Sequence, residues 1–191
     1  MVIKPSGVSY EDLSPDKLVI VDLDGKGVEG SLNPSSDNRT HVILYRAFAE
    51  VGGIVHTHST HAVAWAQAGH DILYYGTMHA DYFCYTLLPQ PYRKRGWRGL
   101  RAQHLRSRCI DISKTGDQSL VHTGVICRNH GPFAWGGNSS EAGYHAVVLE
   151  EFARMGLLTL QADPSARSAP QHVIDKHFQR KHGPNAYYGQ R

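Results

Sequence analysis

The sequence has few cysteines and no long run of apolar residues. Its three cysteines, Cys84, Cys109 and Cys127, form no C-x-x-C pair, so we expect reduced thiols that fill the interior rather than metal ligands. No apolar stretch is long enough to span a bilayer, and the first residues lack the apolar core of a signal peptide. These absences favour a cytoplasmic protein without a membrane partner.

Acidic residues are absent between Tyr82 and Ile110, and this gap shapes the charge of the chain. The gap holds seven basic residues: Arg93, Lys94, Arg95, Arg98, Arg101, Arg106 and Arg108. The whole chain carries a net charge of +3, but without these seven it has 13 basic and 17 acidic residues. Because the positive charge comes from one segment, we expect no nucleic-acid partner.

The sequence also lacks a G-x-G-x-x-G motif, a P-loop and internal repeats. Residue patterns predict strands over 17–23, 54–59 and 125–135, the last a pair broken at Gly131-Pro132. They predict helices over 38–51 and 61–69, a helix after Asn138, and a last helix between Pro170 and Gly183. Strands and helices do not alternate regularly, so we expect one α+β or mixed α/β/α domain over residues 1–191.

Three helix ends carry recognisable signals. Asp37 or Asn38 is a candidate N-cap for the helix over 38–51, and Gly52-Gly53 would stop it. Asn138 with Glu141 three residues later resembles a capping box. The helix that follows is expected to present one apolar face, made of Tyr144, Val147, Val148, Phe152 and Met155.

Two histidines flank Thr57 in the predicted strand over 54–59. Because side chains two apart on a strand share a face, His56 and His58 could both reach one metal ion. His130, at a strand end beside Gly131-Pro132, is the best candidate for a third ligand. Three protein ligands with one open position are typical of catalytic rather than structural zinc. A His-x-His pair alone is weak evidence for metal binding, since histidines on strands are often only hydrogen-bonded.

A set of short motifs, distributed in order along the chain, makes the interpretation specific. They are 4–7 (KPSG), 34–37 (PSSD), 53–59 (GIVHTHS), 79–82 (HADY), 129–136 (NHGPFAWG), 148–151 (VLEE) and 175–190 (from DKH to AYYGQ). Together they resemble the class II aldolase/epimerase family, in particular its L-ribulose-5-phosphate 4-epimerase branch. The resemblance covers the chain except 90–123.

The resemblance implies a three-layer α/β/α domain around a mixed, mainly antiparallel central sheet. It implies one Zn²⁺ per subunit, held by His56, His58 and His130. Asp37 corresponds to an acidic residue near the metal in this family, although the same carboxylate could cap a helix or do both.

The resemblance also assigns the substrate phosphate site, to Ser6, Gly7, Ser35 and Ser36. Hydroxyls and backbone N–H groups at a glycine turn and a helix start suit an anion. Lys4 could add positive charge there or be merely solvated.

Proton transfer is assigned by the resemblance to Asp81 and Tyr188, with Thr77 and His177 near the reacting carbons. The implied enzyme is an isomerase that epimerises carbon four of L-ribulose 5-phosphate by retro-aldol cleavage and re-addition, as in arabinose catabolism. The resemblance further implies a homotetramer with active sites between subunits, each completed by the C-terminal tyrosine of a neighbour.

The chain departs from the family in two places. Members begin with a further helix and strand carrying a Gly-Asn-x-Ser phosphate-binding motif, whereas this sequence starts just before Lys4, so we expect an N-terminal truncation. Residues 90–123 replace a segment that is normally acidic and helical, and family pattern resumes at Gly124, which favours a frame-shift in the coding sequence.

Two other functions are compatible with these residues. One is a class II aldolase acting on L-fuculose or L-rhamnulose phosphate, which shares the His-x-His chemistry but is not expected to end in AYYGQ. The other is a non-catalytic, truncated remnant of the epimerase.

Overall fold

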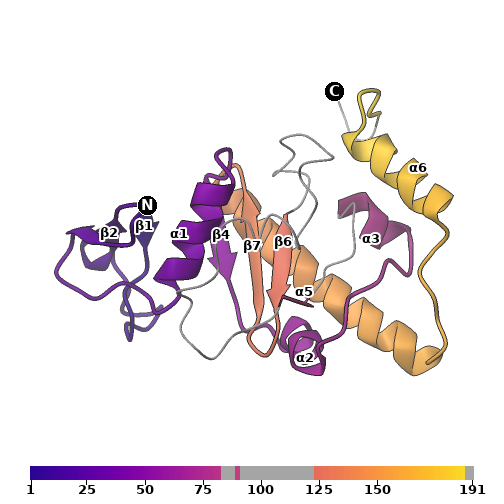
Figure 1. Ribbon diagram of the computed structural model, residues 1–191, viewed down its shortest axis with the longest axis horizontal. Coiled ribbons are helices and arrows are strands. Elements are labelled where there is room, and N and C mark those ends of the chain that lie inside the picture. Colours follow the sequence, from indigo (N-terminus) through magenta and orange to yellow (C-terminus); the bar gives the residue numbers. More distant parts are fainter. Residues whose placement is uncertain (83–88, 91–122, 188–191) are drawn as a thin grey trace. The chain divides into compact units, whose positions relative to one another are not determined.

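The computed structural model describes residues 1–82, 89–90 and 123–187 (Figure 1). The described residues form two compact units, one comprising residues 1–49 and the other the described residues from 50 onward. The single domain expected over residues 1–191 stays a prediction. The expected frame-shift at 90–123 lies outside the described residues except for Gln90 and Thr123, and it too stays a prediction.

The first unit is a small antiparallel sheet followed by a helix. Its strands are ordered β1-β2-β3, with β1 at Val2–Ile3, β2 at Val19–Val21 and β3 at Gly27–Glu29. The short 3-10 helix η1 (Pro15–Lys17) precedes β2, and α1 spans Asn38–Ala47. The hairpin predicted after residues 17–23 is confirmed, with an irregular register between Ile20 and Val21.

Helix α1 is shorter than predicted. It begins after Asp37, which occupies the N-cap position but makes no side-chain capping bond. The helix ends at Ala47 because Phe48 adopts an extended conformation and is buried. The glycines expected to stop it instead permit a close backbone contact. A Cβ on Gly53 would lie 2.6 Å from the carbonyl carbon and oxygen of Asn138, so this position must lack a side chain.

The second unit is built on a four-stranded sheet. Its order is β4-β7-β6-β5, with β4 at Gly53–His56, β5 at Pro89–Gln90, β6 at Gly124–Cys127 and β7 at Pro132–Gly136. Only β5 and β6 run parallel. The sheet is therefore mixed and mainly antiparallel, as predicted.

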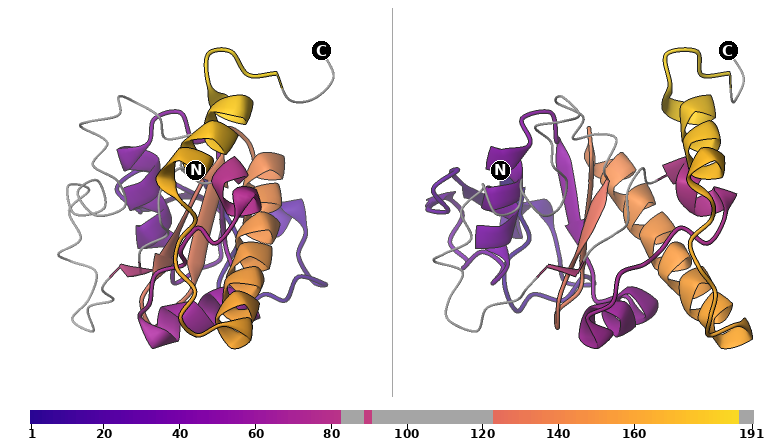
Figure 2. Two further views of the ribbon diagram at one scale, coloured as in Figure 1. Left: turned by 90° about the vertical axis from the view of Figure 1, so that its right-hand side faces the viewer. Right: turned by 45° about the vertical axis from the view of Figure 1, so that its right-hand side comes forward.

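In the described part of this unit, four helices accompany the sheet: α2 (Thr60–Ala68), α3 (Thr77–Tyr82), α5 (Ser139–Ala162) and α6 (Gln171–His182). The long helix α5 runs along the sheet and contacts β4 and β7, while α2 packs against α5 (Figure 1). Helices α3 and α6 lie side by side (Figure 2). Among the described helices, none has both the length and the apolar character that crossing a membrane requires.

The capping box of α5 is confirmed, but its predicted apolar face is partly wrong. The Glu141 backbone N–H donates to Asn138 Oδ1 at 2.9 Å. Tyr144 and Val147, expected to face the core, are 52% and 70% exposed. Phe152 is buried as predicted, and Val148 and Met155 pack against the core. The other buried residues of the helix lie outside the predicted face: Ala142, Leu149, Ala153 and Gly156. The small residues among them allow close approach; a Cβ on Gly156 would lie 3.1 Å from the Trp65 ring.

A buried histidine predicts how the stability of this unit depends on pH. His79 on α3 is 5% exposed and packs against the Phe152 ring, and desolvation by burial lowers its pKa. The neutral form is thus favoured in the folded state, whereas the unfolded chain takes up a proton below about pH 6.5. The contribution of His79 to the free energy of unfolding is therefore full above that pH and is lost as the pH falls.

We expect His79→Leu to flatten the decline of the melting temperature between about pH 7 and pH 5. The exposed His172→Gln on α6 is the control and should keep the wild-type slope. Thermal unfolding followed by circular dichroism measures both variants, and an unchanged slope in His79→Leu would contradict the assignment.

Candidate metal centre

His56 is the last residue of β4, and its backbone is paired with β7. The antiparallel register places His56 opposite Phe133. The two rings stack at a centroid distance of 4.1 Å and an interplanar angle of 16°. Because Phe133 is fully buried, this contact fixes one face of the imidazole against the core.

The tautomer of His56 follows from its hydrogen bond. Its Nδ1 lies 2.8 Å from the carbonyl oxygen of Pro132. A carbonyl can only accept, so Nδ1 carries the proton and Nε2 keeps its lone pair. A ligating histidine is commonly oriented in this way, by a carbonyl or carboxylate on its other nitrogen.

His130 arrives from the turn between β6 and β7. The turn is closed by the His130 N–H donating to Cys127 O at 3.0 Å and the Cys127 N–H donating to Gly131 O at 2.9 Å. Asn129 adopts a positive φ of 60° and donates its N–H to Ala66 O on α2. The turn is therefore tied to α2, and His130 Nε2 lies 2.9 Å from His56 Nε2.

His58 lies in a different type of secondary structure from the one predicted. The strand predicted over 54–59 ends at His56, so His58 belongs to the loop before α2 and not to the strand. The loop is anchored where the Thr57 N–H donates to Pro132 O at 3.3 Å. The exposed His58 ring then lies 4.9 Å from that of His56 and 5.1 Å from that of His130, between centroids.

These three imidazoles form a candidate metal site. One ligand atom from each histidine lies within 4.8 Å of the others. Gly131 leaves the room they need: a Cβ there would be 2.7 Å from Thr57 O and about as close as contact allows to His58 and His56, at 3.4 and 3.5 Å. Neutral imidazoles are favoured ligands for divalent transition metals, and three of them leave a coordination position open. The residues therefore fit a catalytic metal.

The family assignment now has independent support. A model of the Class II Aldolase and Adducin N-terminal domain matches residues 1–157. An "L-ribulose-5-phosphate 4-epimerase UlaF" of Salmonella paratyphi B is 46% identical, over 100% of this chain and 84% of the relative, and one of Salmonella typhi matches to the same extent. The chain belongs to the class II aldolase family.

Solved structures agree with the fold of this class II aldolase. An L-fuculose 1-phosphate aldolase has a TM-score of 0.77 at 22% identity, covering 94% of this chain and 78% of its own. An aldolase II superfamily protein from Pseudomonas syringae has a TM-score of 0.70 at 19% identity, covering 97% and 72%. The α/β class II aldolase fold is thus confirmed, and epimerase relatives that match the whole chain confirm the prediction of an isomerase.

Two of the predicted catalytic residues are brought together. Asp81, 5% exposed on α3, has its Oδ1 3.3 Å from Nδ1 of His177 on α6. The same carboxylate pairs with Arg180 at 3.6 Å and with Lys181 at 3.3 Å. Among the described residues, every ion pair of Asp81 is therefore made with α6. The sequence interpretation gave Asp81 a role in proton transfer and missed that it also anchors α6.

Two further catalytic candidates are Thr77 and Tyr188. Thr77 is exposed and begins α3, four residues before Asp81. Tyr188 lies outside the described residues, which end at Tyr187. The roles of both in catalysis stay predictions.

In the first unit, the residues expected to bind phosphate form one neighbourhood. The Ser6 N–H donates to Asn33 O at 2.9 Å, and the Ser35 N–H donates to Lys4 O at 3.0 Å. Gly7 has a φ of 74°, which glycine adopts without strain. Ser35 Oγ accepts from the Asp37 N–H at 3.3 Å, so Ser35, Ser36 and Asp37 form the entry to α1.

Lys4 and Asp37 have local contacts that bear on their expected roles. The Lys4 ammonium donates to the carbonyls of Pro5 and Val8 and lies over the Tyr10 ring, 5.1 Å from its centroid. Its positive charge is thus held next to the phosphate-site residues. Asp37 is placed at the N-cap of α1, and its role as a metal ligand stays a prediction.

Sequence reasoning missed two interactions close to the three histidines. The Pro132 carbonyl, which orients His56, has no signal in the sequence because any residue supplies a carbonyl. Glu150 on α5 accepts hydrogen bonds from His61, at the start of the helix that follows His58. The motif over 148–151 contains this residue, but no role was inferred for it.

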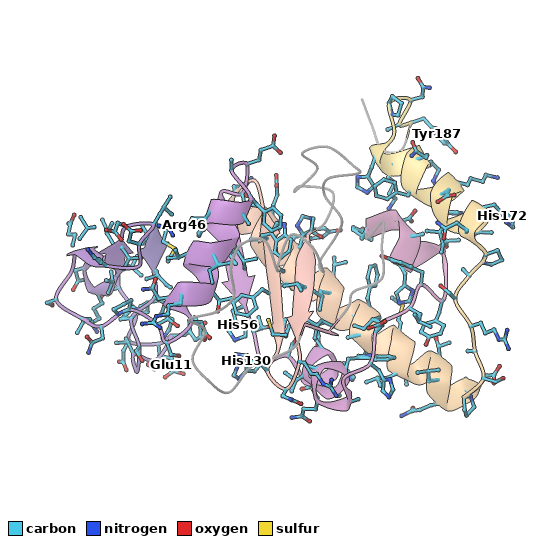
Figure 3. All side chains as sticks on the ribbon, in the orientation of Figure 1. Glu11, Arg46, His56, His130, His172 and Tyr187 are labelled. Atoms are coloured by element: carbon cyan, nitrogen blue, oxygen red, sulfur yellow. The ribbon has the colours of Figure 1, made fainter. Side chains whose placement is uncertain are left out.

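Figure 3 labels His56 and His130, which lie near one another at one end of the sheet.

The tight turn at Gly131 predicts that a side chain there would disturb the ligands without removing any of them. Gly131→Ala should weaken metal binding and lower stability by about 1–3 kcal/mol, because the new Cβ overlaps Thr57 O and presses on two ligand rings. The measurement is zinc affinity by competition with a chromophoric chelator, together with chemical denaturation.

Gly143→Ala is the matched control, since a Cβ at Gly143 meets nothing within 4 Å. Gly143 lies inside α5, so alanine there should raise stability by about 0.5–1 kcal/mol and leave metal affinity unchanged. Equal metal affinity in Gly131→Ala and wild type would show that the turn does not set the ligand geometry.

Proposed function

We propose that this chain is a zinc-dependent epimerase that interconverts L-ribulose 5-phosphate and D-xylulose 5-phosphate. The observation that carries the proposal is the convergence of the His56, His58 and His130 ligand atoms within 4.8 Å, in a chain 46% identical over its whole length to proteins named L-ribulose-5-phosphate 4-epimerase. His56, His58 and His130 would hold the ion, one per chain, with Asp37 as a further ligand or a polarising group.

The reaction cannot proceed by simple deprotonation. Carbon four of the substrate is not adjacent to the carbonyl, so its hydrogen is not acidic. Cleaving the bond between carbons three and four gives the enediolate of dihydroxyacetone and glycolaldehyde phosphate; the aldehyde then rotates and is attacked on its other face. Zinc, when bound, supplies Lewis-acid stabilisation of the negative charge that develops on the substrate oxygens.

Protein groups would handle the protons and the phosphate. One group must take the proton of the carbon-four hydroxyl and another must return a proton on the opposite face, and we assign these roles to Asp81 and Tyr188. Thr77 and His177 would line the path of the rotating aldehyde. Ser6, Gly7, Ser35 and Ser36 would hold the phosphate through hydroxyls and N–H groups, with Lys4 adding charge. This assignment requires residues 1–191 to act as one domain, and we propose a homotetramer in which the C-terminal tyrosine serves a neighbouring site.

The proposal is tested by turnover and metal content together. The purified protein should contain about one zinc ion per chain and form D-xylulose 5-phosphate from L-ribulose 5-phosphate in a coupled assay. Release of dihydroxyacetone phosphate from L-fuculose or L-rhamnulose 1-phosphate, without epimerisation, would make the chain an aldolase. Bound metal with neither activity would make it a non-catalytic remnant.

Removing one ligand should abolish both properties. In His130→Gln we expect loss of bound zinc and a fall in turnover of at least about 100-fold, because the remaining two imidazoles hold a metal poorly. His70→Gln, at an exposed position after α2, should keep both. Elemental analysis and the coupled assay read out the result, and a metal-replete, active His130→Gln would refute the ligand assignment.

Asp81→Asn tests whether the buried carboxylate has a chemical as well as a structural role. The change keeps the shape but removes the charge that balances Arg180 and Lys181 and one acceptor oxygen near His177, so we expect a loss of about 1–3 kcal/mol in stability. Turnover should fall with metal content unchanged, because a neutral amide cannot accept the proton. The exposed Asp175→Asn on α6 is the control for both measurements. Full turnover in folded Asp81→Asn would remove Asp81 from proton transfer.

A further inference from the structure

A carboxylate on α5 takes the place of the missing N-terminal cap of α2. Ser59 occupies the N-cap position of α2, but its side chain makes no capping bond. Glu150 instead accepts from the backbone N–H of His61 at 2.9 Å and from that of Ala62 at 3.0 Å. These are the N–H groups that an N-cap side chain normally satisfies.

The same carboxylate makes a third bond in this region. His61 Nδ1 lies 2.7 Å from Glu150 Oε1, so one carboxylate holds both the backbone and the side chain of His61. Burial raises the pKa of Glu150, but the hydrogen bonds from His61, Ala62 and the Ser59 side chain together outweigh it and leave the pKa below its usual value. The group is therefore an anion, which the positive end of a helix dipole favours.

This contact lies immediately after a proposed metal ligand. His56 ends β4 and Thr60 begins α2, so only three residues, 57–59, connect the strand to the helix. His58 is the middle one. Its ring is exposed, so the interior does not fix its position as Phe133 fixes that of His56. The geometry of His58 must therefore come from the two ends of its loop.

One end of the loop is already fixed by the sheet, because the Thr57 N–H and the His56 ring both bond to Pro132 O. The other end is fixed by α5, which itself contacts β4 and β7 along the sheet. Glu150 lies within α5 and reaches across 89 residues of sequence to His61. The sheet thus holds one end of the three-residue loop, and α5, which packs on that sheet, holds the other.

We propose that Glu150 is a positioning residue for the metal centre, which fixes the loop carrying His58 by holding the first turn of α2 on α5. It does not ligate the metal and does not touch the reacting atoms. The inference rests on the metal-binding function proposed for the three histidines. Its consequence is that the affinity for metal depends on a carboxylate outside the ligand set.

Glu150→Gln tests this, because the amide keeps the shape but loses the charge and one acceptor oxygen. We expect zinc affinity, measured by chelator competition on the metal-free protein, to fall about 10-fold, as for partners that orient metal ligands. The absorption bands of the Co²⁺-substituted protein should also change in position or intensity, since they report ligand geometry. Glu151→Gln is the matched control: this exposed neighbour makes its hydrogen bonds and ion pair with Arg154, not with the first turn of α2, and the change should leave both readouts unchanged.

A second control separates positioning from general loosening of the α2–α5 contact. Trp65→Phe removes the hydrogen bond from Trp65 Nε1 to Ala153 O, which joins the same two helices away from the first turn of α2. It should lower the melting temperature of the metal-free protein but keep zinc affinity and the Co²⁺ spectrum. Should Glu150→Gln fail to fold, Glu150→Asp keeps the charge on a shorter side chain, and we expect it to fold and bind zinc more weakly than wild type.

Wild-type affinity in the folded Glu150 variant overturns the inference, and so does an equal loss of affinity in Trp65→Phe. These outcomes differ from failure of the proposed function itself. If the wild-type protein does not bind zinc or Co²⁺, the metal centre is wrong, and the positioning role of Glu150 is wrong with it.

Discussion

The carbonyl oxygen of Pro132 is the point on which the arrangement of the histidines depends. It accepts from the His56 ring and from the Thr57 backbone, so one atom sets both the tautomer of the first histidine and the start of the loop to the second. Proline is suited to the first position of a strand, where its missing N–H interrupts no ladder. The following residue, Phe133, pairs with His56 and stacks on its ring. Two consecutive residues of β7 thus place the last residue of β4.

A second polar cluster joins α3 to α6 in the same unit. Asp81 is almost fully buried, yet three cationic or titratable side chains of α6 surround its carboxylate. Its backbone carbonyl also lies 2.8 Å from His182 Nε2, at the last residue of α6. Since a buried charge is tolerated only when it is paired, this cluster fixes α6 on α3. Helix α6 ends at His182, only a few residues before Tyr188. The residue proposed to accept a proton therefore also anchors the helix that leads to the proposed proton donor.

Much of this fold could be predicted from local chemistry. The Asn138–Glu141 capping box, the break at Gly131-Pro132 and the glycine after α6 each act within a few residues, and each prediction is confirmed. The errors concern choices made by packing at a distance. Alternation suggested that His58 shares a strand with His56, but the strand ends at His56, and the chain enters α2 at Thr60, where Glu150 of the distant helix α5 bonds to the first turn. Periodicity likewise could not tell which side of α5 meets the sheet, because apolar residues occur around much of its circumference.

The metal ligands come from places far apart in the sequence: 74 residues separate His56 from His130. The β4–β7 ladder brings His56 close to the turn that carries His130. The entropy of closing such a loop grows only with the logarithm of its length, so that doubling the connection costs about 0.6 kcal/mol. The number of residues between these two strands therefore adds little to the free-energy cost of assembling the site, whereas His58, α2 and β6, which lie within that connection, do contribute to it. Distance along the sequence is thus a minor part of what it costs to bring the imidazoles together.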